Sequence, residues 1–157
     1  MLFPSWVRTF ERLALAVLVV ALGACAKVND TALGLVSTKV PAYAIVNGSL
    51  ISGEVVLIPD RTARVTLGSN QALRCAGSMR HTATLSGSVA LTCSDASTTE
   101  LQYTLLTETR GYAYGSNANG PTSLVFGLPP ADARAFLTVP AGKRLALSAA
   151  TGTLELQ

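Results

Sequence analysis

From residue 41 onward, apolar and polar residues alternate along the chain with a period of two. Residues 62–67 and 99–107 show the alternation most clearly. The apolar positions of these two segments are Ala63, Val65, Leu67, Leu101, Tyr103 and Leu105. Because successive side chains of a strand point to opposite faces of a sheet, the pattern predicts half-buried antiparallel strands.

Turn-forming residues interrupt these segments at close intervals. Examples are Asn47-Gly48, Pro59-Asp60, Ser86-Gly87-Ser88 and Ser94-Asp95. Many short strands joined by frequent turns predict an all-β domain, either a small antiparallel sandwich or a barrel. Residues 129–137 (PPADARAFL) depart from the alternation, and their opening prolines and early aspartate predict a short helix. A strand over residues 135–139 is the competing interpretation.

The N-terminal segment has a different pattern. Two arginines, Arg8 and Arg12, precede an apolar run over residues 13–21, which ends in Leu22-Gly23-Ala24-Cys25. This order of basic, apolar and small residues before a cysteine resembles the lipobox signal of bacterial lipoprotein precursors. The resemblance implies cleavage after Ala24 and acyl chains on Cys25. The apolar run is too short for the roughly 20 residues that a membrane-spanning helix needs.

The predicted organisation therefore has three parts. Residues 1–24 form a signal-peptide helix that is removed, residues 25–40 a lipidated N-terminus and flexible tether, and residues 41–157 a single β domain. Ala26 follows the cysteine where an aspartate would retain an enterobacterial lipoprotein in the inner membrane. The resemblance implies an outer-membrane protein that faces the periplasm. A plain secretory signal with an ordinary cut near Cys25 is the alternative.

The charge of the chain argues against one class of partner. It carries 12 basic and 9 acidic residues, a formal net charge of +3, and charged residues make up only 13% of it. The arginines are scattered along the sequence, so no surface for nucleic acid is predicted. The expected partners are the membrane, through the N-terminal lipid, and another envelope protein.

Two cysteines, Cys75 and Cys93, remain after Cys25. Both fall on the apolar faces of predicted strands, and an exported domain with two such thiols is expected to join them in a disulfide. A turn at Ser86-Gly87-Ser88 would not place the two cysteines opposite each other, so a bulge over residues 76–78 is expected to correct the register. A metal pair or a redox pair is disfavoured, because the chain has no Cys-x-x-Cys and no second histidine. No metal site and no cofactor are predicted.

His81 is the only histidine, and its position in the alternation places it on the apolar side of its strand. The predicted role is packing plus one hydrogen bond. No serine lies in a Gly-x-Ser-x-Gly turn, and the carboxylates form no motif, so no catalytic residues are predicted.

The segment over residues 110–121 (RGYAYGSNANGP) is the candidate binding loop. Its candidate residues are Tyr112, Tyr114, Asn117 and Asn119. The two tyrosines lie two positions apart, so they would project together and could stack on a sugar ring or on a partner surface. The alternative is an ordinary hairpin, which uses the same residue types.

A second pattern spans residues 74–127. Its members are Cys75-Ala76-Gly77, Gly87, residues 91–95 (LTCSD), Gly111, Gly115, Gly120 and Phe126-Gly127. The pattern resembles that of small exported proteins of proteobacteria, and the resemblance implies a β domain with a disulfide and no assigned activity. The glycine that often follows Cys-Ser-Asp in those proteins is Ala96 here, so the turn at Asp95 is expected to differ.

Three functions remain, of which the first is preferred. The first is a lipid-anchored structural or protein-interaction domain of the cell envelope. The second is a periplasmic binder of a small ligand or glycan, which uses the tyrosine loop or a barrel mouth. The third is an envelope hydrolase with His81 as its base. A flat exposed apolar edge would favour the first, a concave aromatic patch the second, and a pocket of convergent polar groups the third.

Overall fold

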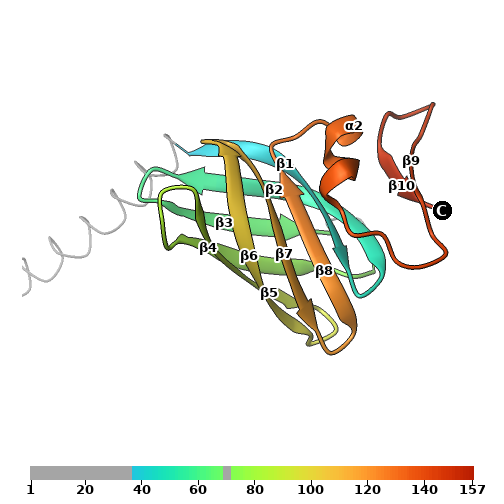
Figure 1. The fold of residues 1–157 in the computed structure, drawn as a ribbon, viewed down its shortest axis with the longest axis horizontal. Coiled ribbons are helices and arrows are strands. Elements are labelled where there is room, and N and C mark those ends of the chain that lie inside the picture. The colour runs from blue at the N-terminus through green and yellow to red at the C-terminus, as the bar shows by residue number, and fades with distance from the viewer. Residues whose placement is uncertain (1–36, 69–71) are drawn as a thin grey trace, which may run out of the picture. The chain divides into compact units, whose positions relative to one another are not determined.

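The computed structural model describes residues 37–68 and 72–157. The predicted signal peptide, the lipidation site Cys25 and residues 26–36 of the tether lie outside the described residues. Eight antiparallel strands form a closed barrel (Figure 1). The strands are β1 (Thr38–Val46), β2 (Ser49–Ile58), β3 (Thr62–Leu67), β4 (Cys75–His81), β5 (Ser86–Cys93), β6 (Thr98–Thr107), β7 (Arg110–Asn117) and β8 (Gly120–Phe126).

Each strand pairs with the next along the chain, and β8 closes the ring by pairing with β1. The all-β prediction is confirmed, and of its two forms the structure has the barrel. Strand β1 begins at Thr38, so the last three residues of the predicted tether, 38–40, belong to the first strand.

The alternation in the sequence separates the inside of the barrel from its outside. In β3, Ala63, Val65 and Leu67 are buried while the residues between them are exposed, as predicted. In β6, Leu101 and Tyr103 are buried and their polar neighbours are exposed, also as predicted. An eight-stranded barrel has an interior that side chains can just fill, and this one is packed with small and medium apolar residues.

The pairing of β4 with β5 corrects one sequence-based expectation. Cys75 lies directly opposite Cys93, with Cα atoms 4.0 Å apart, and their sulfurs are bonded, so the predicted disulfide is confirmed. No bulge is needed, because the strands turn at residues 82–85 and not at Ser86-Gly87-Ser88. Gly87 instead lies inside β5, opposite His81.

The C-terminal segment packs on the outside of the barrel. The helix predicted over residues 129–137 is present as α2 (Pro130–Ala133) followed by the 3₁₀ turn η1 (Arg134–Phe136). A hairpin of β9 (Leu145–Leu147) and β10 (Leu154–Leu156) follows, and Figure 1 shows α2 next to the barrel with the hairpin beyond it.

This segment builds a second apolar core against the outer faces of the first and last strands. Its buried members are Ile45, Val125, Leu128, Ala133, Leu137 and Leu154. The segment therefore covers the place where β1 and β8 close the barrel. Among the described residues, no helix is long and apolar enough to cross a membrane.

Candidate functional site at the barrel mouth

One end of the barrel is closed by hydrogen bonds between side chains. Asn47, in the β1–β2 turn, donates through Nδ2 to Oδ2 of Asp95 (2.7 Å) and to Oγ of Ser97 (3.1 Å) in the β5–β6 turn. Asn117 donates through its own Nδ2 to Oδ1 of Asn47 (3.0 Å) and to Oγ1 of Thr99 (2.8 Å). Because β1 and β5 stand on opposite sides of an eight-stranded ring, these bonds bridge the opening.

The opposite end holds a cavity of about 390 Å³, which we call the mouth. Its lining residues are Leu57, Ile58, Pro59, Arg61, Thr62, His81, Ala83, Thr84, Leu105 and Glu108. They come from the ends of β2, β4 and β6, from the start of β3 and from the turns between these strands. The volume lies in the lower part of the range of small-molecule sites, which runs from roughly 300 to 1,000 Å³.

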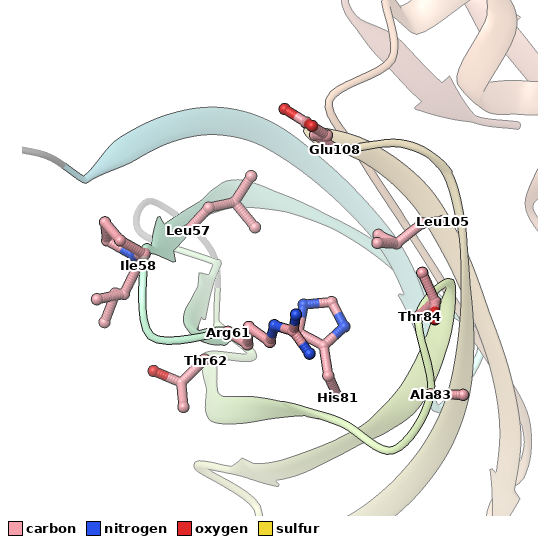
Figure 2. A pocket seen from close by; sticks show the side chains of 10 residues that line it. Leu57, Ile58, Arg61, Thr62, His81, Ala83, Thr84, Leu105 and Glu108 are labelled. Atoms are coloured by element: carbon pink, nitrogen blue, oxygen red, sulfur yellow. The ribbon is translucent and has the colours of Figure 1, made fainter.

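The mouth combines apolar walls with a few polar groups (Figure 2). Arg61 and His81 project into it, and Leu57 and Leu105 stand on its sides. Glu108 lies at the rim, and its carboxylate points away from Arg61 and His81. Within the described residues, neither the Arg61 guanidinium nor the Glu108 carboxylate takes part in a hydrogen bond or an ion pair.

The turn that carries Arg61 holds its backbone in a left-handed conformation, with φ at 66°. Residues other than glycine avoid this region because their Cβ crowds the backbone, at a cost of about 1–2 kcal/mol. Asp60 fixes the turn by accepting hydrogen bonds from the backbone N–H (2.9 Å) and hydroxyl (2.5 Å) of Thr62. These bonds, the side-chain bond foremost, lower the pKa of Asp60 below its ordinary value of 3.8.

The β5–β6 turn at the closed end repeats this geometry. Asp95 accepts hydrogen bonds from the backbone N–H (3.0 Å) and hydroxyl (2.6 Å) of Ser97, and Ala96 has φ at 63°. The side-chain bond from Ser97 is the largest cause of a lowered pKa at Asp95. Ala96 thus adopts the backbone conformation that favours glycine, the residue that the second resemblance places there. Arg61 and Ala96 occupy equivalent positions in two matching turns at opposite ends of the barrel.

His81 of the mouth is positioned by neighbours on two adjacent strands. His81, Gly87 and Tyr103 lie in one row across β4, β5 and β6. A Cβ on Gly87 would lie 2.7 Å from Oη of Tyr103. Because glycine has no Cβ, the Tyr103 side chain can pass over this position and contact His81. Oη of Tyr103 and Nδ1 of His81 are 2.5 Å apart. The predicted hydrogen bond of His81 is therefore present, and the side chain is half-buried on the lining of the mouth.

The residues of the candidate binding loop do not form a loop. Tyr112 and Tyr114 lie on the outer face of β7 with ring centroids 5.4 Å apart, so they project together as predicted. Tyr112 also stacks on Phe136 of η1, with centroids 5.0 Å apart and planes inclined by 20°. Tyr112 is thus occupied by the C-terminal segment, and Tyr114 remains 41% exposed.

Asn117 and Asn119 lie at the end of β7 and in the turn after it. Asn117 belongs to the hydrogen bonds that close the barrel, and its Oδ1 accepts from the backbone N–H of Asn119 at 2.8 Å. The two asparagines are therefore at the closed end, away from the mouth. Ligand binding by the tyrosines or the asparagines stays a prediction.

The residues of the mouth other than His81 were not singled out from the sequence. Leu57, Leu105 and Glu108 have no local pattern that distinguishes them from other strand and turn residues. Arg61 does carry a signal, because it stands at the glycine-favouring position after Pro59-Asp60, and the same turn recurs at residues 93–97. A cationic side chain at a strained position is a candidate for function.

Within residues 37–68 and 72–157, no group of three or more His, Cys, Asp or Glu side chains is placed to hold a metal ion. Comparison with protein-family models, with curated proteins and with solved structures found no match for this chain. The geometry of the mouth is therefore the basis on which a function is inferred.

Proposed function

We propose that this chain is a lipid-anchored protein of the cell envelope whose barrel binds a small molecule in its mouth. The observation that carries the proposal is the contrast between the two ends of the barrel. One end is bridged by the side chains of Asn47, Asp95 and Asn117, whereas the other holds a cavity of about 390 Å³. Apolar walls with a few placed polar groups are typical of small-molecule sites.

The other two functions have less support. A structural or interaction domain would expose a flat apolar edge. Strands β1 to β8 close on themselves, and within the described residues the edge strands are β9 and β10, of three residues each. A hydrolase would need a nucleophile or a carboxylate beside His81. Among the described residues, the only hydrogen bond of the His81 ring is the one with Tyr103.

The proposed anchor is a diacylglyceryl group on Cys25, in the outer membrane and facing the periplasm. Residues 26–37 would join the anchor to β1, and an extended chain of that length reaches at most about 40 Å. Strand β1 starts at the mouth end of the barrel, because β2 ends there in the turn that carries Arg61. The exposed Leu85 and Leu106 are at the same end. This arrangement favours a mouth that faces the membrane surface.

The test uses the full chain in amphipol and three fluorinated probes with one common body: 4-(trifluoromethyl)benzoate, 4-(trifluoromethyl)benzyl alcohol and 4-(trifluoromethyl)benzylamine. Leu105 is half-buried and its side chain points into the mouth (Figure 2), so Leu105→Trp should fill part of the cavity. Ala141 is an exposed turn residue outside the mouth, and Ala141→Trp is the matched control.

We expect ¹⁹F NMR to detect binding of at least one probe. The binding should be lost in Leu105→Trp and kept in Ala141→Trp. Failure of all three probes to bind, or binding that Leu105→Trp leaves unchanged, would overturn the proposed function.

A further inference from the structure

The hydrogen bond between Tyr103 and His81 determines which groups the mouth offers to a ligand. Tyr103 is only 1% exposed, and within the described residues its hydroxyl has no partner other than Nδ1 of His81. A buried phenol with a single partner satisfies its hydrogen only by donating it. Tyr103 therefore donates, and Nδ1 of His81 accepts.

The pKa of Tyr103 agrees with its role as the donor in this hydrogen bond. Burial raises the pKa of the Tyr103 hydroxyl above its ordinary value of 10.0. The phenol thus keeps its proton at neutral pH and remains a donor. In a neutral imidazole whose Nδ1 accepts, the proton is on the other nitrogen, so Nε2–H of His81 is a donor.

Arg61 supplies the second set of donors. Its guanidinium has five N–H groups and no acceptor, and within the described residues none of these groups is paired. Of the described residues on the lining, Glu108 alone has a carboxylate, and it points away. The two nitrogen-bearing groups that project into the mouth, Arg61 and His81, therefore both donate, and the hydroxyls of Thr62 and Thr84 on its lining can donate as well as accept.

From this pairing of donors with apolar walls we infer that the ligand of the mouth is an amphipathic anion. Its acidic group, a carboxylate or a group of similar charge, accepts from Arg61 and from Nε2–H of His81. Its apolar body packs against Leu57, Ile58 and Leu105. A volume of about 390 Å³ lies near the lower end of the range of small-molecule sites, so the ligand should be a small one. The inference rests on the proposed function and specifies the class of its ligand.

The first test measures the tautomer of His81. Because the chain has one histidine, ¹⁵N NMR of imidazole-labelled protein without an affinity tag gives one pair of ring signals. In the neutral ring we expect Nε2 protonated and Nδ1 unprotonated. In Tyr103→Phe the donor to Nδ1 is gone, so the preference of the His81 proton for Nε2 over Nδ1 should weaken. A wild-type ring protonated on Nδ1 would overturn the inference.

The second test compares the three fluorinated probes, which differ in charge but share their body. In the wild type, the benzoate should bind about tenfold more tightly than the alcohol, and the amine more weakly than the alcohol. In Arg61→Gly the benzoate should fall to the affinity of the alcohol. Glycine suits the left-handed backbone at this position, so this variant should fold at least as well as the wild type.

Ala96→Gly is the matched control, because it makes the same backbone change in the equivalent turn and removes no charge. It should leave the affinities of all three probes unchanged. Equal affinity of the wild type for the benzoate and the alcohol would overturn the anion preference and leave the proposed small-molecule site standing. Tight benzoate binding that survives Arg61→Gly would also overturn the inference. Absence of binding by every probe would overturn both proposals.

Discussion

Reduction of the Cys75–Cys93 bond should remove a large part of the stability of the barrel. The bond joins residues 18 apart in sequence, at the start of β4 and the end of β5. In the chain-entropy treatment, opening a loop of that length favours the unfolded chain by about 3 kcal/mol at 25 °C. Small domains are stable by only about 5–15 kcal/mol, so the change is readily measured.

The assay is urea unfolding of the full chain in amphipol, followed by tyrosine fluorescence, with and without a phosphine reductant. With a urea dependence of roughly 1.5 kcal/mol per molar, the midpoint should fall by about 2 M on reduction. The variant with Cys75→Ala and Cys93→Ala should unfold at a low midpoint that the reductant does not change. Equal midpoints for oxidised and reduced wild-type protein would refute the reasoning.

Three further predictions concern other parts of the chain. Gly87→Ala should cost about 3 kcal/mol in urea unfolding, because the new Cβ would lie 2.1 Å from the backbone oxygen of Arg80; a cost within about 0.5 kcal/mol would contradict this. The lowered folded-state pKa values of Asp60 and Asp95 mean that both carboxylates stabilise the fold above the unfolded value of 3.8. This contribution is lost as the pH falls from that value through the lower folded-state pKa values. Asp60→Asn keeps the one oxygen that accepts both bonds from Thr62 but removes the titration, so its melting temperature should drop less on acidification than that of the wild type, and an equal drop would count against the reasoning. Cys25→Ser should abolish incorporation of labelled palmitate, and equal labelling of both forms would rule out the proposed anchor.

The strands could be predicted from the sequence because their signal is local. The alternation over residues 62–67 depends only on which side chains enter the core, and the structure has the same faces. Closure of the barrel depends on β1 meeting β8, which lie far apart in the chain, so the sequence left the sandwich and the barrel equally open. Gly87 was placed in a turn because glycine is common in turns, but here it makes room for Tyr103 inside the barrel.

The mouth could not be predicted, because its residues come from separate strand ends and turns that only the closed ring brings together. Alternation placed His81 and Tyr103 on inward faces, yet it could not show that the two side chains meet across Gly87. In the sequence, Arg61 is one of several scattered arginines. Its left-handed backbone, which it shares with Ala96 in the matching turn, distinguishes it only in the structure. The two tyrosines of β7, by contrast, have a spacing that is visible in the sequence, and it correctly predicts that they project together.

The most direct test of the central claim is a map of backbone amide chemical shifts as 4-(trifluoromethyl)benzoate is added to the full chain. A ligand in the mouth should shift the amides of Arg61, His81 and Leu105 and leave that of Asn47, at the closed end, unchanged. Shifts centred on Asn47, or on Tyr112 at the outer face of β7, with the mouth amides unaffected, would contradict the account.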